Sequence, residues 1–421
     1  MEEAKAGDKV RINTDRETLN GILLESHESG IVLIKLSSGY NIGVRKDEIL
    51  SIDLVEKAKE DKNEKRKLKV NPDLPSVDLI ITGGTISSRL DYKTGGVSWL
   101  TSPEQLFDFY PEIFEICNVR KIEIPFMKAS ENMDSGDWKK IAEIAEKSLN
   151  DKNCKGVIIT HGTDFLHYTS AALSFFLRDL NKPVVLTYSQ RSSDRASSDA
   201  SLNLQCAARA AVSDIAEVML VGHGSQSDDF CYALLGSKVR KMHSSRRDAF
   251  KPVNCKPIAK VFPDKIEKIS KHRIRDDSGK VKLDDSFNEK VALVKFYPGM
   301  DSELIDYLGQ RYNGIVIEAA GLGHLAINEA RKNLLPSIKK AMDNGLIVCA
   351  APQTLGGRLD PLVYSPGREL MKMGVIFLED MLPETAYVKL GFVLGHKAWK
   401  DKIKEKMLEN FSGEINKRLE E

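Results

Sequence analysis

Short apolar segments separated by polar turn residues open the chain. Segments rich in Val, Ile and Leu lie at residues 9–12, 20–26, 30–36 and 40–50, with Gly, Asn and Ser between them. Short apolar segments with turn residues at this spacing are typical of antiparallel strands. The pattern predicts a small β-barrel domain over residues 1–56.

A strongly polar segment follows this predicted domain. Residues 57–69, KAKEDKNEKRKLK, carry almost no apolar side chain, and two prolines follow at 72 and 75. A segment of this composition buries little surface and typically connects two folded domains. We therefore interpret residues 57–75 as a charged linker.

From residue 76 onward, continuous apolar runs alternate with amphipathic stretches. The runs lie at residues 78–81, 156–160, 183–187, 217–222, 291–296, 314–321 and 345–351. Strands buried on both faces of a parallel sheet have this uninterrupted apolar character. Strands that alternate with helices predict an α/β fold in which crossover helices connect parallel strands.

Residues 135–149 show the amphipathic pattern of a helix most clearly. Trp138, Ile141, Ala145 and Leu149 recur at helical spacing, together with Ile144. Ser135 is the expected N-cap, because a Ser side chain can accept hydrogen bonds from the first free backbone amides.

Chain length favours more than one α/β domain. At 421 residues the chain exceeds the roughly 250–300 residues at which single cores stop growing. The highly charged stretch 265–290 lacks a long apolar run and is interpreted as a connection. We predict a first α/β domain over residues 76–275 and a second over residues 288–421.

Composition excludes several classes of protein. The net charge of +1 provides no global field that would attract nucleic acid or an anionic membrane. Six cysteines without any C-x-x-C pair argue against zinc and disulfide frameworks and are expected as buried thiols. No stretch reaches the ~18 apolar residues of a membrane span. We expect a cytoplasmic protein that does not bind a membrane.

The residues that follow the predicted strands suggest chemistry, because ligands bind at the carboxyl ends of parallel strands. TGGT ends in Thr85, HGTD contains Thr163 and Asp164, and Lys241 follows a later apolar run. Hydroxyl and amine side chains are the components of a nucleophile with its base. Taken singly, each threonine motif is also compatible with a tight turn in which the threonine caps a helix.

Neither a phosphate motif nor a metal site is expected. TGGTISS lacks both the G-x-G-x-x-G and the G-x-x-x-x-G-K-[ST] spacing. His161, His223 and His324 lie beside glycines but show no spacing typical of metal ligands, so we expect structural, hydrogen-bonded histidines. No metal or cofactor is predicted for this chain.

TGGTI and HGTD, about 80 residues apart in this order, resemble the two signatures of the two-domain bacterial-type L-asparaginases. The resemblance covers roughly residues 76–400. Together with the preceding β domain and charged linker, it makes the chain more narrowly similar to the GatD family of amidase subunits from archaeal glutamyl-tRNA(Gln) amidotransferases.

The resemblance assigns roles to particular residues. Thr85 corresponds to the first nucleophilic threonine, Tyr92 to the tyrosine of a mobile loop, and Ser130 to a substrate-holding serine. Glu131 stands where the asparaginase family more often has glutamine. The second threonine, its aspartate and the catalytic lysine correspond to Thr163, Asp164 and Lys241.

The resemblance also implies an activity and partners. The expected reaction is hydrolysis of glutamine to glutamate and ammonia, which a GatE-like subunit uses to convert Glu-tRNA(Gln) to Gln-tRNA(Gln). ATP and Mg²⁺ are expected on that partner, as is most of the tRNA contact. The expected assembly is a heterotetramer with two copies of each subunit, in which this chain is dimeric.

Two alternatives stay open at this stage. One is a free-standing L-asparaginase or glutaminase, because glutamine and asparagine differ by one methylene, worth only about 1–3 kcal/mol in a pocket. The other is a nucleic-acid-binding module joined to a catalytically inactive scaffold. The presence of Thr85, Thr163, Asp164 and Lys241 together argues against loss of chemistry.

Overall fold

The computed structural model describes residues 4–24, 26, 30–36, 41–57, 71–90, 97–99, 110–192 and 197–419. The predicted linker is therefore described only at its two ends. Tyr92, the predicted loop tyrosine, lies outside the described residues.

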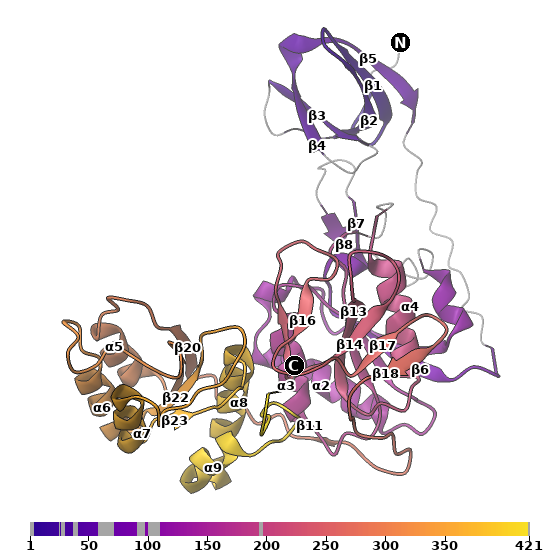
Figure 1. Cartoon of the computed structure of the whole chain (residues 1–421). Helices are drawn as coiled ribbons and strands as arrows, with labels where there is room; N and C mark the ends of the chain where they lie inside the picture. Colours follow the sequence, from indigo (N-terminus) through magenta and orange to yellow (C-terminus); the bar gives the residue numbers. More distant parts are fainter. Residues whose placement is uncertain are drawn as a thin grey trace.

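The N-terminal module is a five-stranded antiparallel sheet, at the top of Figure 1. Its strands, in the order β4-β3-β2-β1-β5, are β1 (Lys9–Thr14), β2 (Thr18–Leu24), β3 (Ile31–Leu36), β4 (Asn41–Arg45) and β5 (Ile49–Glu56). Alternate side chains such as Val10 and Ile12 are fully buried in its core. The predicted all-β module is confirmed.

The expected closure into a barrel is not seen among the described residues of this module. The segment 40–50, predicted as one strand, is divided by the 3₁₀ turn η1 (Lys46–Glu48) into β4 and the start of β5. This turn carries the chain across the sheet, so that β5 pairs with β1 instead of β4. The sheet consequently keeps two edges.

An eight-stranded sheet forms the centre of the next domain. Its order is β18-β17-β14-β13-β12-β10-β6-β9. The strands are β6 (Ser76–Ile81), β9 (Asn118–Glu123), β10 (Val157–Thr160), β12 (Val184–Thr187), β13 (Val218–His223), β14 (Cys231–Leu235), β17 (Ala259–Val261) and β18 (Ile266–Lys268). The first five are parallel, whereas β14, β17 and β18 are antiparallel. The apolar runs predicted four of the parallel strands, β6, β10, β12 and β13, but not the edge strand β9.

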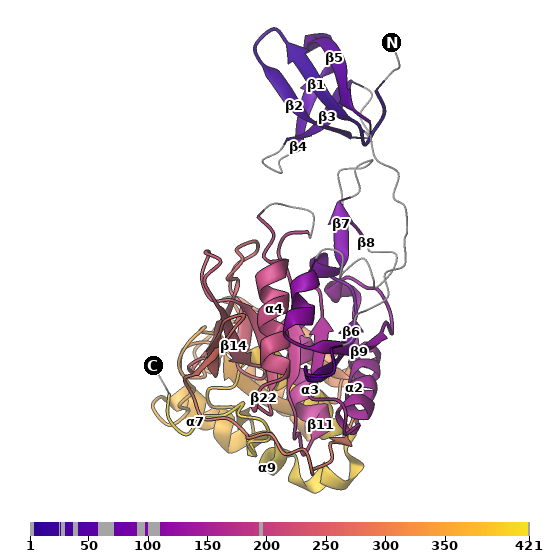
Figure 2. The ribbon, with the colours of Figure 1, turned by 90° about the vertical axis from the view of Figure 1, so that its right-hand side faces the viewer.

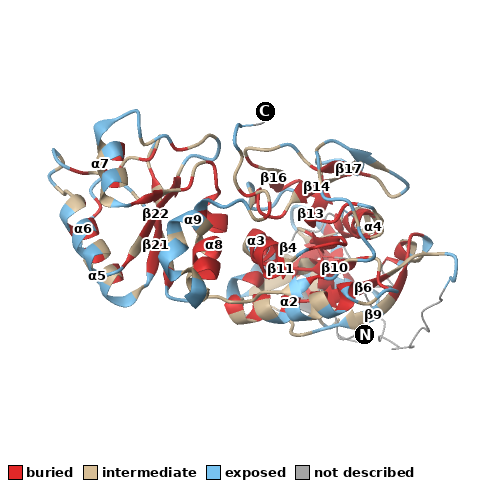
Figure 3. Ribbon diagram, turned by 90° about the horizontal axis from the view of Figure 1, so that it is seen from below, coloured by how far each residue is buried: buried red, intermediate tan, exposed pale blue. Residues whose placement is uncertain are grey.

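Helices cover both faces of this sheet. α2 (Ser135–Leu149) and α3 (Leu166–Phe176) pack into one apolar core, and α4 (Ala200–Ala211) packs into the other together with η3 (Pro111–Glu115). Figure 3 shows the strands and the inward helix faces as buried. The N-cap of α2 is Asp134 instead of the predicted Ser135, because the Asp134 carboxylate accepts from the Gly136 and Asp137 amides.

Three short hairpins or strand pairs complete the domain. They are β7 (Ser88–Leu90) with β8 (Val97–Trp99), β11 (Leu177–Arg178) with β19 (Lys282–Leu283), and β15 (Val239–Lys241) with β16 (Phe250–Pro252). The hairpin of β15 and β16 matters most for function, because Lys241 is its last residue before the turn.

The C-terminal domain, at the left of Figure 1, is a second parallel α/β unit. Its strands are β20 (Val291–Lys295), β21 (Gly314–Ala319), β22 (Ile347–Pro352) and β23 (Ile376–Phe377). Its helices are α5 (Glu303–Arg311), α6 (Leu335–Asp343), α7 (Ser365–Met373), α8 (Pro383–Gly395) and α9 (Ile403–Leu408). Figure 2, turned by 90°, shows this domain behind the central sheet.

The two α/β domains share one apolar core. Helix α8 lies between the C-terminal sheet and α3, and the Phe175 and Phe392 rings stack across this boundary at 5.9 Å. Five of the six thiols are buried, as predicted, and Cys255 is half-buried. No described helix is long and apolar enough to cross a membrane.

Two buried ion pairs hold the C-terminal segment and α8 in place. Lys389 Nζ donates to Glu414 Oε1 at 2.6 Å, and neither side chain is exposed. Lys238 and Asp380 form the second pair, also at 2.6 Å and fully buried. Burial lowers the pKa of Lys389, and Glu414 counteracts that shift.

Replacing one member of the Lys389–Glu414 pair is expected to destabilise the protein strongly. Lys389→Met leaves the Glu414 carboxylate buried without its cation, which typically costs about 3–5 kcal/mol. The double variant Lys389→Met/Glu414→Gln should recover a large part of this loss. Denaturant unfolding of the wild type, the two single variants and the double variant measures the coupling energy between the two side chains. Equal stability of wild type and Lys389→Met would contradict the expected destabilisation.

Candidate active site

Strand pairing places the two threonine motifs side by side. Strands β6 and β10 are adjacent and parallel, with Ile81 opposite Thr160. Just beyond, the Thr82 hydroxyl donates to the Thr160 carbonyl at 2.8 Å. The TGGT and HGTD segments therefore leave the same edge of the sheet together.

Two glycines allow these segments to touch. Gly83 and Gly84 have φ values of +121° and +83°, a conformation that side-chain-bearing residues rarely adopt. A Cβ atom on Gly84 would lie 2.5 Å from Gly162 N and from the His161 carbonyl. Thr85, half-buried, begins the 3₁₀ turn η2 (Thr85–Ser87) immediately after this contact.

Lys241 connects the second threonine to its aspartate. Its Nζ atom donates to Thr163 Oγ1 at 2.9 Å and to Asp164 Oδ1 at 2.7 Å. The Lys241 side chain is 11% exposed, whereas that of Asp164 is 62% exposed. The structure thus brings together three of the residues that the sequence singled out, from two distant segments.

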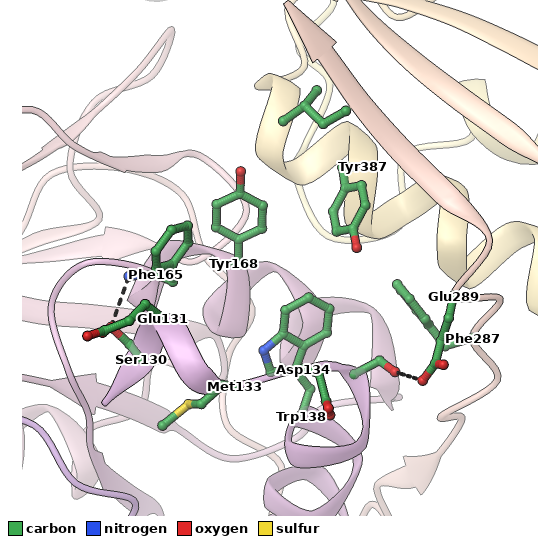
Figure 4. A pocket seen from close by; sticks show the side chains of 12 residues that line it. Ser130, Glu131, Met133, Asp134, Trp138, Phe165, Tyr168, Phe287, Glu289 and Tyr387 are labelled. Carbon is green, nitrogen blue, oxygen red and sulfur yellow. Dashed lines mark hydrogen bonds between the residues drawn. The ribbon is translucent and has the colours of Figure 1, made fainter. Parts of the chain in front are cut away.

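Ser130 packs against the same loop. It begins the turn η4 (Ser130–Asn132) and is buried, and its Oγ atom accepts from the Phe165 amide at 3.2 Å. A Cβ atom on Gly162 would lie 3.0 Å from that Oγ. Glu131 is exposed beside it, and both line the pocket of Figure 4.

This pocket has a volume of about 420 Å³ and lies between α2, α3 and the C-terminal domain. Its lining is aromatic, hydroxylic and acidic: Ser130, Glu131, Met133, Asp134, Ser135, Trp138, Phe165, Tyr168, Phe287, Glu289, Leu293 and Tyr387. No Lys or Arg belongs to this described lining. The pocket consequently favours a ligand with a positively charged group.

Two buried histidines beside the site are neutral. Burial lowers the pKa of His161 to about 4, its Nδ1 donates to the Gly162 carbonyl, and the Thr169 hydroxyl donates to its Nε2. Burial, aided by Arg240 and Lys241, lowers the pKa of His167 to about 3. Because both imidazoles are neutral, neither places a positive charge near Lys241.

The expected structural role is confirmed for two of the three predicted histidines. His161 and His223 are hydrogen-bonded, the latter to Asn203 and Asp228. His324 is different, because neither of its ring nitrogens has a partner in the described part of the chain, and its ring packs edge-on against Tyr364. No group of three potential metal ligands occurs among the described residues.

Sequence reasoning missed the support of the lysine strand. Arg240 Nε lies 3.1 Å from Glu384 Oε1 at the start of α8, which connects β15 to the C-terminal domain. Burial raises the pKa of Glu384, and the Arg240 charge opposes this. Arg240 precedes Lys241 directly, but nothing local in the sequence identifies a partner so distant along the chain.

Family models match three consecutive parts of the chain. The GatD N-terminal domain matches residues 4–55, the N-terminal asparaginase domain residues 76–274, and the C-terminal glutaminase/asparaginase domain residues 290–407. The small β module and the two α/β domains are each recognised separately.

Curated relatives match the chain over nearly its whole length. The D subunit of the glutamyl-tRNA(Gln) amidotransferase of Thermococcus kodakarensis is 51% identical, covering 97% of this chain and 94% of its own. The protein of the same name from Pyrococcus furiosus is 50% identical, covering 98% and 95%.

Two solved L-asparaginases each match about four fifths of the chain. The thermostable L-asparaginase from Thermococcus kodakarensis has a TM-score of 0.71 at 29% identity and covers 81% of this chain and 99% of its own. L-asparaginase I from Vibrio cholerae has a TM-score of 0.69 at 27% identity, covering 82% and 99%. The amidotransferase relatives cover nearly the whole chain, the GatD N-terminal domain matches residues 4–55, and the chain belongs to the family of glutamyl-tRNA(Gln) amidotransferase D subunits.

Proposed function

We propose that this chain hydrolyses glutamine to glutamate and ammonia as the amidase subunit of a tRNA-dependent amidotransferase. The observation that carries the proposal is the Lys241 amine bonded to both Thr163 and Asp164, next to the loop of Thr85. Similarity to amidotransferase D subunits over 97% of the chain supports this function over a free-standing L-asparaginase.

The first chemical step is attack on the side-chain amide of glutamine. The Thr85 hydroxyl oxygen bonds to the amide carbon, and its proton passes to a neighbouring base. The resulting tetrahedral intermediate breaks its C–N bond, and the departing nitrogen takes up a proton and leaves as ammonia. A glutamyl ester of Thr85 remains.

The second step regenerates the threonine. Water bonds to the ester carbon and yields a proton to the base, and the C–O bond to Thr85 breaks with return of a proton to its hydroxyl. Glutamate is the second product. Thr163 and Lys241 supply the proton path, and Asp164 holds the Lys241 amine in position through its 2.7 Å contact.

Ser130 and Glu131 bind the substrate in this proposal. Ser130 is fixed by the Phe165 amide, and Glu131 is exposed beside it in an acidic pocket without cations. A carboxylate at this position attracts the α-ammonium group of an amino acid. Tyr92, outside the described residues, stays a prediction as the tyrosine of a loop that closes over the substrate.

The remaining parts of the reaction are assigned to a GatE-like partner. That subunit uses ATP and Mg²⁺ to activate the tRNA-bound glutamate and transfers the ammonia, in a heterotetramer with two copies of each chain. It also makes most contacts to Glu-tRNA(Gln), and the complex works in the cytoplasm. This chain then requires no cofactor of its own.

Thr85→Ala and Thr163→Ala should each lower glutaminase activity by several orders of magnitude with the fold intact. Removing one residue of a catalytic set often lowers the rate nearly as much as removing the whole set. Thr85→Val and Thr163→Val are the isosteric controls and should be equally inactive. Thr187→Val, at the end of neighbouring β12, should keep most activity because that hydroxyl donates to the Val221 carbonyl, away from the threonine motifs. A folded alanine variant with more than about a tenth of wild-type turnover would exclude its threonine from the chemistry.

Lys241→Arg should damage turnover nearly as much as Lys241→Met. Arginine keeps the positive charge, but its pKa above ~12 prevents it from accepting a proton. Lys251→Arg on the opposite strand of the hairpin is the matched control and should turn over glutamine normally, because Lys251 pairs with Asp248. Near-normal kcat for Lys241→Arg would show that only the charge of the lysine matters.

Ammonia release from glutamine should rise severalfold when a GatE-like subunit and Glu-tRNA(Gln) are added to the full chain. Ammonia released into water is lost to the transfer reaction, so coupling to the acceptor is expected. ATP consumption should require the partner. Rapid asparagine hydrolysis by the isolated chain, unaffected by partner and tRNA, would instead identify a free-standing amidohydrolase.

A further inference from the structure

Two adjoining hollows lie at the end of the central sheet opposite to the active site. One, of about 800 Å³, is lined by the loop before β17 and by the C-terminal segment. The other, of about 520 Å³, includes Asn181, which precedes the amino end of β12. They meet at Arg273, Phe411 and Ser412, and we call them together the basal groove.

Positive side chains dominate the basal groove. Its cations are Arg178, Lys256, Lys271, Arg273 and Lys280, and its acidic side chains are Asp179, Glu217 and Asp276. Glu217 forms an ion pair with Arg273, and Asp179 forms one with Lys282, which lies outside the lining. Asp276 accepts from Ser278 and is the only acidic group of this lining without a basic partner.

Most of these cations have no acidic partner. Within the described ranges no carboxylate pairs with Lys256, Lys271 or Lys280, all of which are exposed. Arg178 lies over the Phe411 ring at 4.6 Å instead of against an acid. Clustered unpaired cations repel one another. The electrostatic free energy of binding an anion is therefore more favourable here than at a surface whose cations are already paired.

The sequence around the groove also contains more basic than acidic residues. Residues 251–282 contain ten Lys or Arg and four Asp or Glu side chains, although the whole chain has a net charge of only +1. The positive charge is therefore local and faces away from the acidic pocket near Ser130. Such a separation attracts an anionic partner to one end of the molecule.

The spread of the cations indicates an extended anion. Lys256 and Lys271 line one hollow, Lys280 and Arg178 line the other, and a single small anion would neutralise only part of them. A chain of phosphodiesters provides regularly repeated negative charges along such a surface. The Phe411 ring already contacts Arg178 and Lys389, so the feature of the groove that favours such a chain is its charge and not base stacking.

We propose that the basal groove binds the phosphodiester backbone of an RNA, the tRNA on which the complex acts. This inference rests on the proposed function, because it assigns to this chain a direct electrostatic contact with the tRNA. Recognition through phosphates positions the tRNA without reading its sequence.

The test measures binding of the full chain to a labelled tRNA(Gln) transcript by fluorescence anisotropy between about 50 and 200 mM KCl. The groove variant is Lys256→Glu/Lys271→Glu/Lys280→Glu. The matched control, Lys140→Glu/Lys290→Glu/Lys372→Glu, changes the net charge equally at exposed lysines outside the groove. Glutamine hydrolysis without tRNA is measured for all three proteins.

The groove variant should bind tRNA at least about tenfold more weakly and with a smaller salt dependence than wild type. The control variant should stay within about threefold of wild type, and all should hydrolyse glutamine equally. Equal tRNA affinity of groove variant and control, with glutaminase intact, overturns the inference and leaves the proposed function standing. Weaker binding to a GatE-like subunit with unchanged tRNA affinity also overturns it, in favour of a protein contact. Absence of glutamine hydrolysis in wild type contradicts the proposed function itself.

Discussion

The close approach of Gly84 to the backbone of His161 and Gly162 is the contact on which the catalytic arrangement depends. It needs the parallel register of β6 and β10 and two residues with positive φ. With any side chain at position 84, a Cβ atom 2.5 Å from backbone atoms would force the two loops apart. Since Gly162 in turn packs on Ser130, one contact fixes the relative positions of three functional segments.

The second α/β domain braces this arrangement from outside. The HGTD loop leads into α3, whose apolar face packs against α8 of the C-terminal domain. The strand that carries Lys241 is tied to the same helix through Arg240 and Glu384. Both sides of the contact between Lys241 and Thr163 are therefore held by one helix, which is consistent with the precision that proton transfer requires.

A nearly neutral net charge conceals two regions of opposite sign. The described lining of the pocket beside Ser130 contains carboxylates and no Lys or Arg, whereas the basal groove is lined by lysines that pair with no carboxylate of the described ranges. Their separation matches two different ligands, an amino acid with an ammonium group and a polyanion. Charge averaged over a chain hides such differences, because opposite patches cancel in the sum.

The sequence alone predicted the strands that are continuous apolar runs and the separate N-terminal β module. It also singled out Thr163, Asp164 and Lys241, which the structure brings into contact. Apolar runs report burial directly, and the two signature motifs carry their chemistry within a few consecutive residues. The apolar pattern missed β9, β14, β17 and β18. Of these, β9 and β18 are the two edge strands of the sheet, and β17 and β18 have only three residues each. The sequence pattern predicts Ser135 as the N-cap of α2, but Asp134 caps it, because both residue types suit an N-cap and they are adjacent.

Which distant residues meet depends on how whole elements pack. The tertiary structure places Lys241 on Thr163, Arg240 on Glu384 and Gly84 on Gly162, and it leaves the five-stranded module without a pairing between β4 and β5 in its described residues. Each of these contacts joins segments whose local patterns carry no information about one another. The physical reason is that periodicity encodes which face of an element is buried, whereas packing of complete elements selects the partner that buries it.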